Sequence, residues 1–180
     1  MKIFIILIVV TNVSLAETCD EYYIKKLVKI SSISLNEFIE EFSSEEFKRE
    51  VSNKNYCYRE KVQLMEDYYY ANEFSRDYLK QRLADGWGFV GDYDKAIEWS
   101  YKQLNGDKST PWNNYIFARI AYFRNNEAEF VEYYNLISDD PDYTFGNAMM
   151  ITWLEMLIEN FDKPFRYIVE NAEIGDLASD

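Results

Sequence analysis

The sequence predicts an all-α protein built from antiparallel helical hairpins that stack on one another. Large apolar residues recur at the three- and four-residue spacing of a helix face, and no stretch alternates apolar and polar residues as a strand would. Turn-forming pairs such as Gly91-Asp92 separate segments of helical length. In the second half, apolar residues repeat at a spacing of 34, in sets that begin with Leu83, Phe89, Ile97 and Trp99.

Caps and turns in the sequence set the ends of the expected helices. Ser34 and Glu37 have the spacing of a capping box, in which each side chain bonds the backbone N–H of the other residue. Thr110 before Pro111 is an N-cap followed by proline at the first helical position. Asp20 can cap the first helix. The expected helices cover residues 20–30, 35–47, 58–71, 76–90, 93–104, 111–123, 127–137, 145–159 and 161–171.

The first 16 residues have the features of a secretory signal peptide. Lys2 supplies a positive charge, residues 3–10 form a short apolar run, and Ser14 and Ala16 place small residues where a signal peptidase cleaves. The alternative is a membrane anchor, but the run is well short of the ~20 residues that a spanning helix needs. We therefore expect an exported protein, periplasmic or secreted, that begins at Glu17 and does not insert into a membrane.

Cys19 and Cys57 are the two cysteines of the chain. In an oxidising compartment two cysteines most simply form one disulfide. The bond would join positions 38 apart and tie the start of the exported chain to a later helix. In the chain-entropy model it would stabilise the fold by ~3–4 kcal/mol.

The charge of the chain restricts its partners. The formal net charge is −13, and without Lys2 the remaining 18 basic and 32 acidic residues give −14. Nucleic acid and an anionic membrane surface are poor partners for such a field, whereas a protein with a basic surface would be attracted. The alternative is that the charge only keeps an exported protein soluble.

The absence of histidine limits the chemistry that the chain can perform. Ser-His-Asp and Cys-His catalysis need an imidazole, and so do the common zinc sites. We therefore predict no enzymatic activity, no cofactor and no metal site. The alternative from another class is a carboxylate-dependent hydrolase of cell-wall glycans, because the acidic residues could supply a catalytic pair.

Residues 91–99, with the sequence GDYDKAIEW, resemble the turn and second-helix start of a tetratricopeptide repeat. In that family the small residue now at Ala96 lets two helices approach closely, and Ala84 and Ala118 occupy the other small position in two successive units. The later units depart from the pattern, since Phe130 and Pro164 stand where the first unit has Ala96. The alternative is a non-repeating helical bundle whose helix lengths give a similar spacing.

The resemblance implies a short solenoid within a single domain. It covers residues 76–171, or about three units, with capping helices in residues 17–75 and a tail in residues 172–180. A fourth, degenerate hairpin at residues 35–71 lacks the motif.

The resemblance also implies that the first helices of the units line a concave groove that binds a partner peptide or helix. Aromatic and arginine side chains are the usual anchors of such a surface, because they bury much area with few rotatable bonds to freeze. The alternative is that many of them belong to the core. The expected partner-binding residues are Tyr78, Phe89, Trp112, Tyr115, Arg119, Tyr122 and Trp153, with Gln81, Asp85, Phe123, Met149 and Met156 as further groove positions.

The sequence therefore predicts an exported module that binds another protein through an acidic, aromatic-lined helical groove. A more specific form of this hypothesis is an immunity or inhibitor protein that neutralises a basic toxin. An adaptor in envelope assembly or secretion is the alternative within the same class. Binding of a small ligand in the groove is a third possibility, from a different class.

Overall fold

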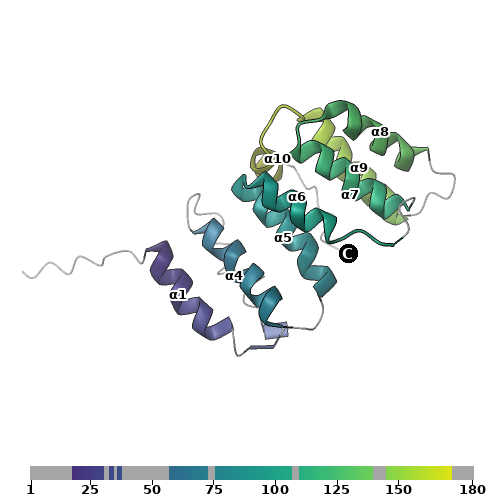
Figure 1. Ribbon diagram of the computed structural model, residues 1–180. Coiled ribbons are helices and arrows are strands. Elements are labelled where there is room, and N and C mark those ends of the chain that lie inside the picture. The colour runs from purple at the N-terminus through teal and green to yellow at the C-terminus, as the bar shows by residue number, and fades with distance from the viewer. Residues whose placement is uncertain are drawn as a thin grey trace, which may run out of the picture.

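The computed structural model describes residues 18–30, 33–34, 36–37, 57–72, 76–106, 110–139 and 145–171. Within these ranges the chain forms eight helices and no strand, so the predicted all-α hairpin stack is confirmed (Figure 1). The predicted signal peptide, most of the helix expected at 35–47 and the tail at 172–180 lie outside the described residues. The helices are α1 (Cys19–Ile30), α4 (Tyr58–Ala71), α5 (Arg76–Val90), α6 (Tyr93–Tyr101), α7 (Pro111–Phe123), α8 (Glu127–Ser138), α9 (Phe145–Glu159) and α10 (Phe165–Asn171).

The helices pack largely in chain order. α1 lies at one end of the molecule against α4, and α4 packs on α5 (Figure 1). The hairpins α5–α6 and α7–α8 follow, and α6 packs on α7. α9 contacts both α7 and α8, while α10 packs on α9 and also on α5. α10, the last of the described helices, therefore returns to the first hairpin of the predicted repeats.

Local capping explains where several helices begin. The Thr110 side chain accepts a hydrogen bond from the Asn113 backbone N–H at the start of α7, as predicted. The capping box of Ser34 and Glu37 is also present, because each residue's side chain accepts from the other's backbone N–H.

Two predicted boundaries at helix starts are wrong. α1 begins at Cys19 rather than after an Asp20 cap, because Thr18 accepts from the Glu21 backbone N–H and caps the helix two residues earlier. The last helix begins at Phe165 rather than at residue 161. Residues 160–163 instead form a turn that brings the Phe161 ring against Phe130.

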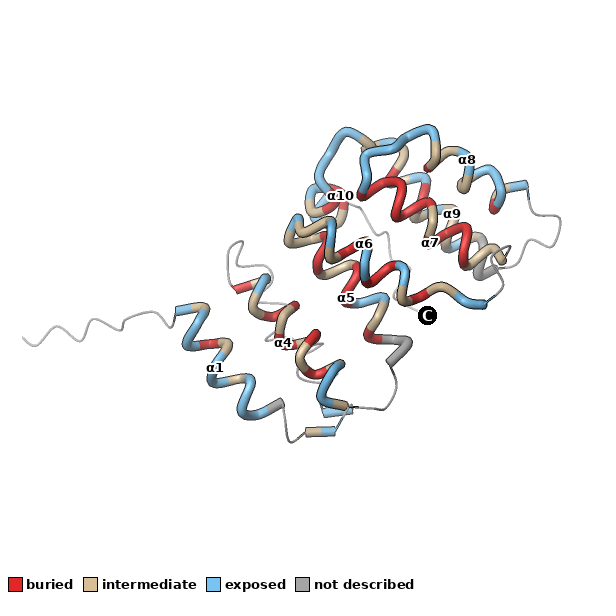
Figure 2. Tube along the Cα trace, in the orientation of Figure 1, coloured by how far each residue is buried: buried red, intermediate tan, exposed pale blue. Residues whose placement is uncertain are grey.

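The core lies mainly around α7, which is buried along nearly its whole length (Figure 2). Trp87 of α5 and Trp99 of α6 are the largest fully buried side chains. Ala84, Ala96 and Ala118 have no exposed surface, as expected where helices pack closely. A smaller cluster joins α1 to α4 and α5 and consists of Tyr22, Cys57, Leu64, Tyr68 and Leu79.

None of the described helices is both long enough and apolar enough to cross a membrane.

Candidate partner-binding site

The predicted partner-binding residues lie on α5, α7 and α9, and we call the surface formed by these three helices the inner face. The structure buries the three predicted residues in the middle of α7. Tyr115 is 5% exposed, Arg119 is 1% exposed, and Tyr122 is also buried. In this conformation these side chains leave almost no surface of their own for a partner. The burial of Tyr115, Arg119 and Tyr122 agrees with the alternative that many of the predicted groove residues belong to the core.

A part-buried ion pair links α5 to α7. The Arg119 guanidinium donates from Nη2 to Oδ1 of Asp85, which lies 34 residues earlier in the chain and is 37% exposed at its side chain. Burial alone would lower the pKa of Arg119, but its interactions with Asp85 and Tyr115 together outweigh this effect and raise the pKa. Burial raises the pKa of the Tyr115 hydroxyl to about 12. Asp85 thus presents a carboxylate to solvent while it compensates a buried positive charge.

The Arg119 guanidinium also lies close to two rings of α7. Its carbon lies 5.5 Å from the centre of the Tyr115 ring and 5.9 Å from that of Phe123. Within the described residues its Nε and Nη1 atoms are buried without a hydrogen-bond partner. Asp85 is therefore the principal charge that holds this cation in the core.

Trp112 is half-buried at the start of α7 and is held in place on two sides. Its indole N–H donates to the backbone carbonyl of Gln103 at 3.1 Å, and its ring centre lies 5.7 Å from that of Tyr115. The Thr110 cap and Pro111 fix the first turn of α7 and so fix the position from which this side chain leaves the helix. Trp112 therefore offers part of an aromatic ring in one fixed orientation.

The opposite end of the inner face is covered by α10. The fully buried ring of Phe165 lies 6.2 Å from Trp153, and Arg166 stacks over the ring of Phe89 at 5.1 Å. The Tyr122 hydroxyl donates to the Lys163 backbone carbonyl at 2.6 Å. Phe89 and Trp153 are consequently half-buried beneath α10.

Gly88 permits this close approach of α10. A Cβ atom at Gly88 would lie 2.8 Å from the Phe123 ring and 3.2 Å from the Phe165 ring. Of the other predicted positions, Gln81 and Met149 are exposed and Met156 is half-buried. Tyr78 belongs to α5, but its side chain lies outside the described residues.

A second aromatic surface, which was not predicted from the sequence, is an open recess of about 380 Å³ lined by Tyr69, Tyr70, Lys80 and Lys102. The Tyr70 ring is 62% exposed and its centre lies 5.9 Å from that of the buried Trp99. Lys102 lies 3.9 Å above the Trp99 ring and donates to Glu98 and to the Tyr70 hydroxyl. Burial lowers the pKa of Lys102, but these hydrogen bonds outweigh it and raise the pKa. The signal in the sequence was the run of three tyrosines at 68–70, which must point to different sides of one helix.

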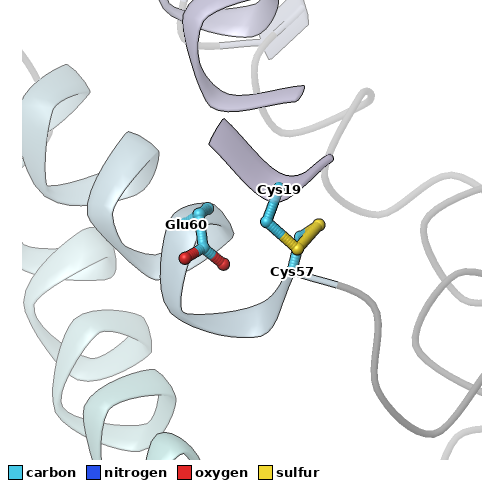
Figure 3. Close-up of side chains that lie close together, drawn as sticks. All are labelled: Cys19, Cys57 and Glu60. Carbon is cyan, nitrogen blue, oxygen red and sulfur yellow. A yellow bond between two sulfur atoms is a disulfide. The ribbon is translucent and has the colours of Figure 1, made fainter. Parts of the chain in front are cut away.

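The predicted disulfide between Cys19 and Cys57 is present (Figure 3), with the two Cα atoms 5.1 Å apart. Glu60 lies beside it, and these three residues are the described group whose ligand atoms are close enough to hold a metal ion. Because the sulfurs are bonded to each other, they lack the thiolate charge with which cysteine binds metals. The disulfide therefore links the first residue of α1 covalently to Cys57 at the start of α4.

Comparison of the chain with known protein families, with curated proteins and with solved structures finds no match.

Proposed function

We propose that this chain is an exported module that binds another protein through the end of the inner face that α10 leaves open. Trp112 and Asp85 form the centre of this surface, with Gln81 as a further exposed position on α5. The single observation that carries the proposal is the half-buried, hydrogen-bonded Trp112 ring, held against Tyr115 next to the Asp85–Arg119 pair.

Pre-organisation is the physical reason for choosing Trp112. Binding freezes side-chain rotations at a cost of about 0.5–1.5 kcal/mol for each flexible side chain. The hydrogen bond from Trp112 to Gln103 and the contact with Tyr115 restrict this ring before any partner arrives. Tryptophan is also among the residues that most often dominate binding energy at the centre of an interface.

Charge favours a basic partner. The net charge of −13 would steer a positively charged protein towards the chain, and the exposed part of the Asp85 carboxylate would meet its cations at the surface. An immunity or inhibitor protein that neutralises a basic toxin is the more specific form of this proposal. An adaptor for envelope assembly or secretion is the alternative. The predicted signal peptide and the disulfide favour a site of action outside the cytoplasm.

Site-specific photo-crosslinking in the native compartment tests this proposal. A photoreactive phenylalanine analogue in place of Trp112 is expected to form one dominant crosslink to another protein. The matched control carries the analogue in place of Leu136, an exposed apolar residue on α8. Mass spectrometry of the crosslinked band identifies the partner and separates a toxic enzyme from an assembly factor.

Two results would overturn the proposal. One is the absence of a crosslink at Trp112 while the variant is folded and exported. The other is the same pattern of crosslinks from both positions, which would indicate chance encounters rather than a binding surface. Turnover of peptidoglycan by the purified protein, abolished by one Asp or Glu substitution, would instead favour the hydrolase alternative.

A further inference from the structure

The turn that follows α6 carries the chain's single Asn-Gly pair, Asn105-Gly106. Both residues are exposed, and apart from the chain neighbours no described atom lies within 4 Å of the position that a Cβ would take at Gly106. Glycine has no side chain to hinder the approach of its own backbone nitrogen to a neighbouring group. The Asn105 carboxamide therefore stands next to the least hindered backbone N–H that a sequence can place there.

The backbone of Asn105 is held by a buried side chain of α7. The Asn105 N–H donates to Oδ1 of Asn113 at 2.9 Å, and Nδ2 of Asn113 donates to the Asn105 carbonyl at 3.1 Å. Asn113 has no exposed surface, and its neighbour Trp112 donates to the carbonyl of Gln103 in the same turn. Both bonds to Asn105 use its backbone, and neither engages its carboxamide. The turn thus holds the start of α7 through main-chain atoms, while the Asn105 side chain lies outside this pair of bonds.

From this arrangement we propose that Asn105 is a site of spontaneous deamidation and isomerisation that alters the support of Trp112. The Gly106 backbone nitrogen, once it has lost its proton, bonds to the Asn105 Cγ, and the carboxamide nitrogen leaves as ammonia. The product is a succinimide ring. Water then adds to either ring carbonyl and opens the ring, which gives aspartate or isoaspartate at position 105. In total a water molecule is consumed, ammonia is released and a carboxylate is gained, with no oxidant or reductant.

Isoaspartate changes the main chain at the point where Asn113 holds it. The link to Gly106 then runs through the Cβ and Cγ atoms of residue 105, and the former main-chain carbonyl becomes a carboxylate. That charge lies against the fully buried Asn113, whose amide must rearrange or admit water. We expect the adjoining bond from Trp112 to Gln103 to weaken as the turn adjusts. The inference concerns how Trp112 is held and does not depend on the proposed partner.

Asp85-Gly86 supplies an internal control, because this pair could close the same ring. Both residues lie within α5, whose hydrogen bonds fix the backbone. A Cβ at Gly86 would lie 2.8 Å from the Val62 side chain, so the site is also closely packed. Asp85 should therefore remain unchanged while Asn105 reacts.

Incubation of the folded, oxidised protein at mildly alkaline pH, followed by peptide mapping with mass spectrometry, tests the reaction. Asn105 is expected to react faster than every other asparagine, and its isoaspartyl product should resist an aspartate-specific protease. Gly106→Ala is expected to slow the reaction about tenfold, because the methyl group hinders the backbone nitrogen. Alanine fits this position without strain, since Gly91 is the described glycine with a positive φ. An unchanged rate in Gly106→Ala, or another asparagine that reacts as fast, would overturn the assignment of the site.

Solution NMR of the indole N–H groups tests the effect on Trp112. The aged protein should show a shifted signal for Trp112, assigned with Trp112→Phe, while the signal of Trp153 on α9 stays in place. Freshly prepared Asn105→Asp is the matched control, because it gains a carboxylate without the detour in the main chain, and its Trp112 signal should stay close to that of the wild type. An isoaspartyl protein with an unchanged Trp112 signal would overturn the proposed effect, as would a shift of the same size in Asn105→Asp.

Discussion

Removal of the Asp85 carboxylate should destabilise this protein more than its position near the surface implies. Asp85→Ala leaves the 1% exposed guanidinium of Arg119 without its negative partner, and its Nε and Nη1 atoms already lack hydrogen bonds within the described residues. Breaking a fully buried ion pair by removing one partner costs about 3–5 kcal/mol. Because the Asp85 side chain is 37% exposed, water can reach the site and partly replace the lost carboxylate. We therefore expect a loss of stability at the lower end of this range, about 3 kcal/mol.

The double-substitution cycle separates this buried charge from simple loss of packing. Arg119→Met removes the charge and keeps most of the volume, so it should cost less than Asp85→Ala. In the double variant no buried cation remains, and we expect it to be more stable than Asp85→Ala alone by at least about 1 kcal/mol. Urea unfolding followed by far-UV circular dichroism measures all four proteins, with Glu98→Ala as the control for an exposed pair. That control should cost less than about 1 kcal/mol.

Two outcomes would refute this reasoning. If Asp85→Ala cost no more than Glu98→Ala, the guanidinium would not depend on its partner for burial. If the double variant were as unstable as the two single losses combined, the pair would be uncoupled and the packing around α7 would account for the effect.

Three further changes have defined outcomes. Gly88→Ala brings a Cβ within 2.8 Å of the Phe123 ring, and overpacking should lower the free energy of unfolding by about 1–3 kcal/mol in a thermal melt. Replacement of Cys19 and Cys57 by serine should cost about 2–5 kcal/mol, with amide exchange rising first in α1, which the bond ties to α4. The pKa of Tyr115 is raised to about 12 from an ordinary value near 10. Its contribution to stability is therefore complete below about pH 10 and is lost as pH rises through about 12. An absorbance titration of tyrosinate should show one fewer late-titrating group in Tyr115→Phe, and no change there would contradict this assignment.

The starts and ends of α4, α5 and α7 could be predicted because their causes are local in the sequence, whereas α6 ends at Tyr101, short of the predicted residue 104. α4 and α5 begin and end where the pattern and the turns place them. α7 starts at Pro111 because a capping threonine and a proline act within one turn. The start of α10 was missed for a different reason. The Phe161 ring packs against Phe130 of α8 and Tyr122 of α7, and this long-range packing outweighs the local tendency to begin a helix.

Burial of the candidate binding residues could not be read from the pattern of α7. A helix with one open face shows an apolar stripe opposite a polar side. α7 packs against α6, α8 and α9, so it has little solvent-exposed face and its sequence lacks a polar side that would mark one. Arg119 looked like a surface anchor because arginine is rarely buried without a partner. Its partner lies on another helix 34 residues away, and no local signal indicated that pairing.

Because α7 lies at the centre of the core, it limits which surfaces can bind another chain. It also allows substitutions that affect binding to be distinguished from substitutions that affect stability. Aromatic side chains of its middle and C-terminal part are enclosed by neighbouring helices and by the segment that leads into α10, so substitutions there act first on folding. The surface left for another chain lies towards the margin, at Trp112 in the first turn of α7. Gln81→Ala, at an exposed position on α5, should therefore change partner binding without changing the unfolding midpoint. Phe123→Ala should do the reverse, because it removes a buried ring that contacts Tyr93, Tyr122 and Phe165 and should cost about 3–5 kcal/mol. If Phe123→Ala proved as stable as the wild type, the core would not be centred on α7. The inner face would then have to be reconsidered as an open groove.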